Sequence, residues 1–227
     1  MKISILIPCY NEYNTINKII NKVQLVELQN IKKEIIVIND GSNDGTENLL
    51  KKIENIKLIN HKNNKGKGEA IKSGLKHANG DIVLIQDADL EYDPNDYLNL
   101  IKPFESDEIK VVYGSRRLKK NNYSTLSFYL GGIVLTKIAN FLYSNANLTD
   151  MHTCYKLFRK DLIDQIELES KGFEFCPEIT AKILNKNIFI KEVGISYFPR
   201  NKTEGKKIQW KDGFIAIYIL LKYKFFT

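Results

Sequence analysis

Cysteine is scarce in this sequence of 227 residues, and the few cysteines present exclude two kinds of site. Cys9, Cys154 and Cys176 are odd in number and have no paired spacing, so they indicate neither a disulfide framework nor a thiolate metal site. A chain without disulfides fits a reducing compartment. We therefore expect a cytoplasmic protein.

Long hydrophobic runs are also missing. The longest uninterrupted apolar run covers residues 214–221 and is far shorter than the ~20 residues that span a bilayer. Strand-like sequence begins almost directly after Met1, which leaves no room for a signal peptide. We expect a chain that does not cross a membrane by itself.

The formal net charge of +7 is distributed unevenly along the chain. Residues 1–113 contain slightly more acidic than basic residues, so the positive charge lies in residues 114–227. We expect the second half to face an anion. A nucleic-acid partner is not predicted, because the acids cluster where the phosphates of a nucleic acid would lie.

Strand-length hydrophobic runs alternate with helical stretches in the first half of the chain. The runs cover residues 3–7, 34–38, 56–59, 81–85 and 109–113. Between several of them, apolar residues recur at helical spacing. This alternation predicts an α/β fold with a mostly parallel central sheet flanked by helices. No linker interrupts residues 1–227, so we expect a single domain.

Two apolar segments of the second half are compatible with helices and rich in aromatic residues. They cover residues 126–144 and 210–226, and lysines flank the second. One interpretation is a pair of amphipathic helices lying on a membrane surface. The other is a pair of helices that cover the core. We expect a peripheral contact with the cytoplasmic face of a membrane. A separate membrane-spanning partner is compatible with such a contact.

Acidic residues directly follow the hydrophobic run at 81–85. On an extended chain, Asp87 and Asp89 would present their carboxylates to one point, with Glu91 as a third oxygen donor. Such oxygens suit Mg²⁺ or Mn²⁺, which keep bound waters and complete their coordination with substrate phosphates. The sequence therefore predicts a divalent metal and a diphosphate at this strand end.

Other polar motifs also follow expected strands, where open α/β sheets bind their ligands. They are "IPCYNE" at 7–12, "INDGSNDGT" at 38–46, "NNKGKGEAIKSG" at 63–74 and "YGSRR" at 113–117. In this order they resemble glycosyltransferase family 2, the inverting nucleotide-sugar enzymes with a GT-A fold. The second half is most similar to the branch of dolichyl-phosphate mannose synthases and bacterial polyprenyl-phosphate sugar synthases. This similarity continues at 149–159, 173–184 and 197–213.

The resemblance implies a role for particular residues. Residues 1–113 would bind the nucleotide sugar and residues 114–227 the acceptor. The implied nucleotide-sugar ligands are Pro8, Tyr10, Glu12, Asp40, Asp87, Ala88, Asp89, Glu91, Arg200 and either Lys206 or Lys207. The implied catalytic residues are Asp89, Arg116 and Asp150.

The chain also departs from the family pattern in three places. Residue 39 is Asn where the family often has an aspartate, which leaves Asp40 to hold the base. Residue 91 is Glu where the mannose synthases usually have Gln. Glu91 could therefore bind either the metal or a sugar hydroxyl. Residues 154–158 read "CYKLF" in place of Cys-Gly-Phe-Lys, which weakens the transfer of acceptor details.

The activity implied is a single displacement that moves a hexose from a donor of the GDP-mannose or UDP-glucose type. We expect a polyprenyl or dolichyl phosphate as acceptor, since its oxygen is already ionised near neutral pH. The alternative acceptor is a saccharide hydroxyl, from which Asp150 would accept the proton. A sugar nucleotidyltransferase and a non-catalytic nucleotide-sugar-binding protein are remoter alternatives. The first would carry a glycine-rich loop where this chain has "PCYNE".

Overall fold

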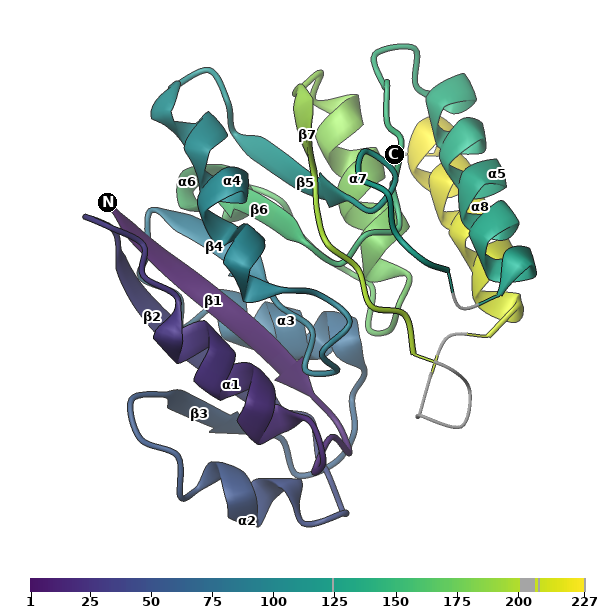
Figure 1. The fold of residues 1–227 in the computed structure, drawn as a ribbon. Helices are drawn as coiled ribbons and strands as arrows, with labels where there is room; N and C mark the ends of the chain where they lie inside the picture. Colours follow the sequence, from purple (N-terminus) through teal and green to yellow (C-terminus); the bar gives the residue numbers. More distant parts are fainter. Residues whose placement is uncertain (124, 201–206, 208, 227) are drawn as a thin grey trace.

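The computed structural model describes residues 1–123, 125–200, 207 and 209–226. In this part of the chain seven strands form one sheet, in the order β3-β2-β1-β4-β6-β5-β7 (Figure 1). The strands are β1 Lys2–Cys9, β2 Lys32–Asn39, β3 Lys57–Asn60, β4 Ile82–Ile85, β5 Val111–Ser115, β6 Lys156–Arg159 and β7 Ile190–Gly194.

The sheet is mostly parallel, as predicted. β1 runs parallel to β2 and β4, β3 runs parallel to β2, and β7 runs parallel to β5. Only β6, among the described strands, is antiparallel to its neighbours, and it lies between β4 and β5. The five strands expected from the hydrophobic runs are all present, so the α/β fold is confirmed.

The sequence did not predict β6 and β7. Both are short, and β6 begins with Lys156, a residue type that rarely marks a buried strand. The pairing of Leu157 with Leu84 of β4 and Val112 of β5 places β6 in the sheet. Tertiary pairing therefore decided these two strands.

Helices cover both faces of the sheet. α1, α2 and α4 pack on one apolar layer, and α3, α5, α6, α7 and α8 pack on the other. Alternate residues of β1 supply the two layers, because Ile5 faces the first and Leu6 the second. The helices are α1 Ile16–Leu25, α2 Thr46–Leu50, α3 Lys67–Leu75, α4 Tyr97–Ile101, α5 Leu126–Leu142, α6 Lys160–Ile163, α7 Phe175–Asn185 and α8 Lys211–Phe225, with 3₁₀ turns at Pro94–Asp96 and Lys102–Glu105.

The C-terminal helix α8 packs beside α5 and α7 (Figure 1). Polar contacts fix it there. The Tyr223 hydroxyl donates to Glu178 Oε1 at 3.1 Å, and the Tyr143 hydroxyl donates to the Leu220 carbonyl oxygen at 3.0 Å. The inner face of this helix pair therefore belongs to the core, as one of the two interpretations held.

The outer face of α5 and α8 is apolar and exposed. We call it the α5–α8 face, and it comprises Leu126, Tyr129, Leu130, Val134, Phe141, Phe214, Ile215, Tyr218, Leu221 and Phe225. Phe141 is 89% exposed, which is unusual for a large apolar side chain. No described helix is both long and apolar enough to span a bilayer. The core interpretation therefore holds for the inner face, and the membrane-surface interpretation stays a prediction for the outer face.

Two glycines at the start of α3 allow a close approach of the chain at residues 170–172. A Cβ atom on Gly66 would lie 2.4 Å from the Lys171 carbonyl oxygen, and one on Gly68 would lie 2.5 Å from the Ser170 carbonyl oxygen. The buried carboxylate of Glu178 fixes that segment by accepting the Ser170 N–H at 2.8 Å. These glycines are therefore needed for packing.

We predict that Gly68→Ala lowers the free energy of unfolding by about 1–3 kcal/mol, because backbone must move to admit the methyl group. Thermal and urea unfolding of the purified variant would measure the loss. Gly131→Ala is the matched control, since a Cβ there meets nothing within 4 Å. The control should unfold at or above the wild-type temperature, because alanine favours a helix more than glycine does. Equal stability of the two variants would contradict the packing role.

Candidate active site

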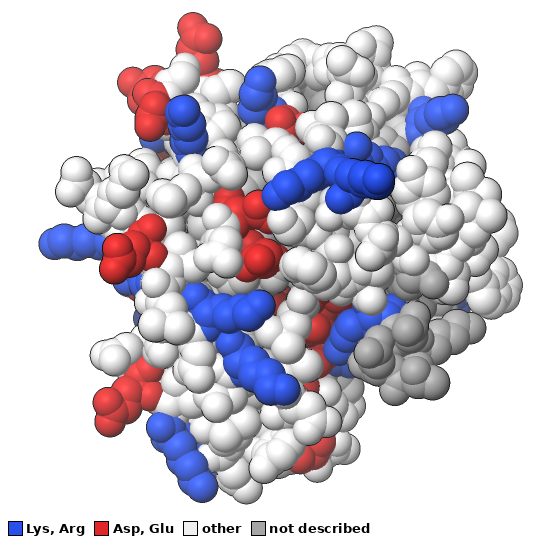
Figure 2. All heavy atoms as spheres, in the orientation of Figure 1, with Lys and Arg blue, Asp and Glu red and all other residues white. Residues whose placement is uncertain are grey.

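Polar side chains from several strand ends meet along one edge of the sheet. Glu12 follows β1, Asp40 follows β2, Asp89 follows β4 and Arg116 follows β5. Arg200 reaches the same edge from the chain beyond β7. Figure 2 shows acidic side chains gathered in the middle of this view, with basic side chains beside them. The carboxyl-end location predicted from the sequence is therefore where the charged residues meet.

Arg200 bridges two acids of the first half of the chain. Its Nη1 lies 3.1 Å from Glu12 Oε2, and its Nη2 lies 2.9 Å from Asp89 Oδ2. Lys207 Nζ adds a second cation 2.8 Å from Glu12 Oε1. The predicted basic residues are thus brought to the predicted acids, except that Lys206 lies outside the described residues.

Lys67 is a site residue to which the sequence analysis gave no role. It is the first residue of α3, and its Nζ pairs with the Asp87 carboxylate and lies 3.2 Å from Cys154 Sγ. Burial favours the neutral form of Asp87, but the Lys67 charge and hydrogen bonds from Cys154 and Lys67 outweigh burial and lower its pKa. The sequence feature that could have identified Lys67 is the lysine within "GKG" of the third motif. A lysine at the start of a helix that packs on the sheet needs an anionic partner.

Asp89 has the opposite electrostatic balance. Burial, together with repulsion from Asp87 and Glu91, raises the pKa of Asp89 to about 7, although Arg200 acts against this rise. The cluster contains four carboxylates, those of Glu12, Asp87, Asp89 and Glu91, against the three cations Lys67, Arg200 and Lys207. An additional cation would be bound favourably between them.

The three predicted metal ligands do not converge on one point. β4 ends at Ile85, and Leu90 has a left-handed φ of 66°, so the chain is not extended from Asp87 to Glu91 as the prediction required. Glu91 instead accepts hydrogen bonds from Arg200 N at 2.7 Å and the Tyr197 hydroxyl at 3.1 Å. No group of three His, Cys, Asp or Glu side chains in the described ranges could hold a metal ion.

Asp87 and Asp89 remain as a pair of oxygen donors. Two carboxylates in a cluster where acids outnumber cations fit Mg²⁺ or Mn²⁺, which take their other ligands from water and phosphate. The structure therefore reduces the expected donor set from three carboxylates to two.

Asp40 organises the loop that precedes α3. Its Oδ1 is 2.6 Å from His61 Nδ1 and accepts the Lys65 N–H at 3.0 Å, while Oδ2 accepts the Gly66 N–H at 2.8 Å. The neighbouring Asn39 joins Asn60 by a side-chain hydrogen bond of 3.0 Å. Asp40 is thus held at the strand end by its own chain, and its predicted contact with the base stays a prediction.

The remaining donor-side residues differ in their access to solvent. Pro8 and Tyr10 are partly exposed at the end of β1, where a ligand can reach them. Lys207 Nζ lies 5.6 Å from the centre of the Tyr10 ring. Ala88, by contrast, is only 4% exposed and packs in the core, so its side chain offers little contact to a ligand.

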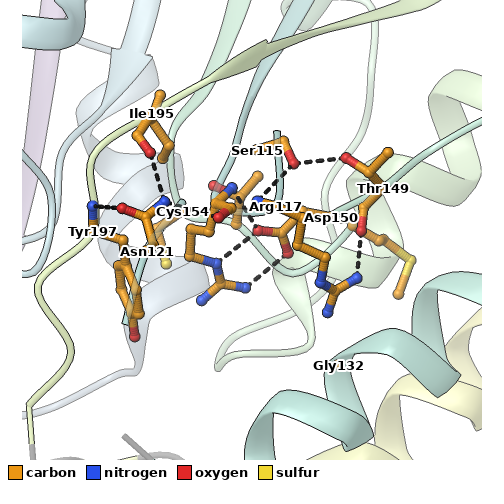
Figure 3. A network of polar contacts seen from close by, with 12 residues as sticks. Ser115, Arg117, Asn121, Gly132, Thr149, Asp150, Cys154, Ile195 and Tyr197 are labelled. Carbon is orange, nitrogen blue, oxygen red and sulfur yellow. Dashed lines mark hydrogen bonds and ion pairs between the residues drawn. The ribbon is translucent and has the colours of Figure 1, made fainter. Parts of the chain in front are cut away.

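Arg116 and Asp150 form a two-pronged ion pair at the end of β5, within the network in Figure 3. Arg116 Nε and Nη2 donate to the two carboxylate oxygens at 2.7 and 2.8 Å. Burial opposes ionisation of Asp150, but the charge of Arg116 and its hydrogen bonds hold the pKa of this carboxyl below its ordinary value. Such a carboxylate is a weak base, so this geometry argues against the proton-accepting role predicted for Asp150.

Comparisons with known proteins point to one family. Residues 4–167 match the family model described as glycosyl transferase family 2. The chain is 28% identical over 214 residues to a dolichol-phosphate mannosyltransferase of Pyrococcus furiosus, with 91% of this chain and 59% of the relative covered. It is 28% identical over 245 residues to a UDP-N-acetylglucosamine–dolichyl-phosphate N-acetylglucosaminyltransferase of Methanococcus voltae, with coverages of 98% and 96%. The chain therefore spans little more than half of the first relative.

A solved structure with the same fold comes from Mycobacterium tuberculosis. It is glucosyl-3-phosphoglycerate synthase in complex with Mn²⁺, UDP and glucosyl-3-phosphoglycerate, with a TM-score of 0.76 and 18% identity. The match covers 98% of this chain and 78% of that chain. The GT-A fold expected from the resemblance is thereby confirmed.

We predict that Asp89 makes the ligand-free protein less stable as the pH rises. The pKa of Asp89 is about 7 in the fold and about 3.9 in an unfolded chain, so the folded state binds the proton more tightly. Its stabilising contribution is complete below pH ~4 and is lost between pH ~4 and ~7. Unfolding in a chelating buffer across this range would measure the loss, at up to about 1.4 kcal/mol per pH unit.

Asp89→Asn should remove this part of the pH dependence and melt above the wild type at pH 8. Asp107→Asn is the control, because Asp107 is fully exposed in the loop before β5. It should keep the wild-type profile. Identical profiles for the wild type and Asp89→Asn would show that Asp89 ionises normally.

Proposed function

Since the chain belongs to glycosyl transferase family 2, we propose that it transfers a hexose from a nucleotide sugar to a polyprenyl or dolichyl phosphate. The observation that carries the donor half of this proposal is the charge arrangement at the strand ends. Asp87 and Asp89 belong to a cluster in which four carboxylates meet three cations, with Arg200 beside Asp89 and Lys207 beside Glu12. A metal–diphosphate unit matches both parts of that arrangement.

The donor would lie between the strand ends and the basic residues of the second half. Pro8, Tyr10 and Asp40 would contact the nucleoside, and Glu12 would hold the two cations in position. Arg200 and Lys207 would then donate to the diphosphate oxygens, with charge-assisted hydrogen bonds that strengthen as the diphosphate leaves. Asp87 and Asp89 would hold Mg²⁺ or Mn²⁺, which neutralises the leaving diphosphate. The solved relatives that contain UDP with Mn²⁺ or Mg²⁺ support this placement.

A lipid phosphate is the acceptor that the geometry favours. A saccharide hydroxyl needs a base, and the candidate Asp150 is buried in its ion pair with Arg116. A phosphate oxygen is already ionised and needs none. The exposed α5–α8 face offers an apolar surface for the lipid, and the relatives of Pyrococcus and Methanococcus are named for dolichyl-phosphate acceptors.

This acceptor would bring the protein to the cytoplasmic surface of a membrane. Exposed lysines at 137, 211 and 224 lie on α5 and α8 beside the α5–α8 face. An apolar surface edged by cations suits the interface of an anionic bilayer. We propose a peripheral association through this face.

The donor proposal is tested by thermal unfolding with UDP- and GDP-sugars, each with and without Mn²⁺. We predict that one nucleotide class raises the melting temperature only when metal is present. Asp89→Asn should lose this shift and most transfer to a polyprenyl phosphate, whereas Asp107→Asn should keep both. A metal-dependent shift and normal transfer in Asp89→Asn would refute the metal site. Pyrophosphate release from a nucleoside triphosphate and a sugar phosphate would instead support a nucleotidyltransferase.

The membrane proposal is tested by sedimentation with vesicles of phosphatidylglycerol and phosphatidylcholine. We predict that the protein pellets at low salt and is released as salt rises, because screening weakens the attraction of the lysines. Phe214→Ser with Tyr218→Ser should reduce pelleting. Phe189→Ser, at an exposed site before β7 and away from the α5–α8 face, should not. Equal pelleting with and without vesicles would eliminate the membrane surface.

A further inference from the structure

Arg117 lies between the candidate active site and α5. It is the second residue after β5, and its Nη1 donates to the Thr149 carbonyl oxygen (Figure 3). The same Nη1 donates to Thr136 Oγ1 at 3.4 Å. Its guanidinium carbon is 5.8 Å from the centre of the Tyr129 ring on α5. The side chain is therefore fixed at the boundary between the Arg116–Asp150 pair and the α5–α8 face.

The acids near Arg117 are already engaged elsewhere. Asp150 gives both oxygens to Arg116, and Glu192 accepts the backbone N–H groups of Thr149 and Asp150 at 2.7 and 2.9 Å. No carboxylate of the described chain forms an ion pair with Arg117. Burial lowers the pKa of this guanidinium more than Asp150 and Glu192 raise it, which agrees with a positive charge that lacks a direct counter-ion.

Part of the Arg117 guanidinium is open to a ligand. Both of its bonds to described residues use Nη1, and neither Nε nor Nη2 is among the buried atoms without a partner. Gly132 on α5 provides the space, because a Cβ there would lie 2.9 Å from Nη2. Two N–H-bearing atoms of one planar group can donate side by side to two oxygens of a phosphate.

The surface next to Arg117 is apolar. Tyr129, Gly132 and Thr136 form the side of α5 that the guanidinium touches. Tyr129 is itself 40% exposed and belongs to the α5–α8 face, and Leu126 of the same face lies one helical turn before it. A hydrocarbon chain attached to an anion at Arg117 would thus meet an apolar surface directly beside that anion.

We propose that Arg117 binds the phosphate group of a lipid-phosphate acceptor whose isoprenoid chain runs along the α5–α8 face. This inference rests on the proposed function and names the acceptor-binding residue of the same site. It places the acceptor phosphate at Arg117 and not at the neighbouring Arg116, which the resemblance implied as a catalytic residue, because Arg116 is committed to Asp150. Arg116 and Asp150 act as positioning residues that fix the strand end from which Arg117 extends.

The proposal is tested by calorimetric binding of geranyl phosphate, with geraniol as the uncharged probe. Arg117→Gln should weaken geranyl phosphate binding by about tenfold or more, the loss expected for hydrogen bonds to a charged group. Binding of geraniol should stay the same. Lys120→Gln is the control for net charge, because Lys120 is exposed and is not one of the residues that contact Arg117. It should bind geranyl phosphate as the wild type does.

A pair of glycine variants tests the same site without a change of charge. Gly132→Ala should crowd Nη2 of Arg117 and weaken geranyl phosphate binding, whereas Gly131→Ala should not, since its Cβ meets nothing within 4 Å. Arg117→Lys keeps the charge without the planar pair of donors and should bind with intermediate affinity. These variants also keep the test informative if Arg117→Gln does not fold.

Donor binding separates the possible failures. Each folded variant should retain the metal-dependent thermal shift with the nucleotide, because Arg117 does not belong to the donor site. Wild-type binding of geranyl phosphate by Arg117→Gln would overturn the assignment of Arg117 and leave the proposed function standing. A wild type that binds no geranyl phosphate and glycosylates only a saccharide hydroxyl would overturn the lipid acceptor and this inference together. Loss of donor and geranyl phosphate binding in equal measure would assign Arg117 a purely structural role.

Discussion

The compensation of buried carboxylates at the strand ends is the constraint on which the rest of the site depends. Parallel strands bring Glu12, Asp87 and Asp89 to one edge of the sheet, where their charges repel one another in a partly desolvated space. Cations must therefore come from elsewhere. Lys67 arrives from the start of α3, and Arg200 arrives from beyond β7. The residual excess of acids over cations is the feature from which we propose a divalent metal at this edge.

This constraint joins the two halves of the chain. Arg200 and Lys207 belong to the basic second half, yet their partners lie in the acidic first half. β6 strengthens the union, because it pairs with β4 on one side and β5 on the other. The halves predicted to bind donor and acceptor thus share one sheet, and residues from both contribute to the same site.

A second ion pair, separate from the acid cluster, lies at the end of β5. The pair of Arg116 and Asp150 is buried and internally satisfied, so it serves better as a support than as a reactive group. The adjacent Arg117 has only neutral hydrogen-bond partners among the described residues. The helices α5 and α8 contribute differently on their two faces, because the inner face completes the core and the outer face stays apolar and exposed. A charged group at the edge of an apolar surface is what an amphipathic phospholipid-like acceptor requires.

The sequence by itself determined the α/β class, the five strands with long hydrophobic runs, and the motifs whose residues gather at the strand ends. Those features depend on local periodicity and on residue types, both of which are properties of the sequence itself. Tertiary structure alone decided the rest. Lys67 meets Asp87 across a gap in sequence that no spacing predicts. Leu90 adopts a left-handed backbone, and the Glu91 carboxylate accepts hydrogen bonds from Arg200 N and the Tyr197 hydroxyl. Likewise, adjacent arginines look equivalent in "GSRR", but only folding brings Asp150 to Arg116 and leaves Arg117 beside α5. Long-range packing determines the partner of each charged side chain. In this protein, that partner determines whether the side chain is neutralised within the fold or can bind a ligand.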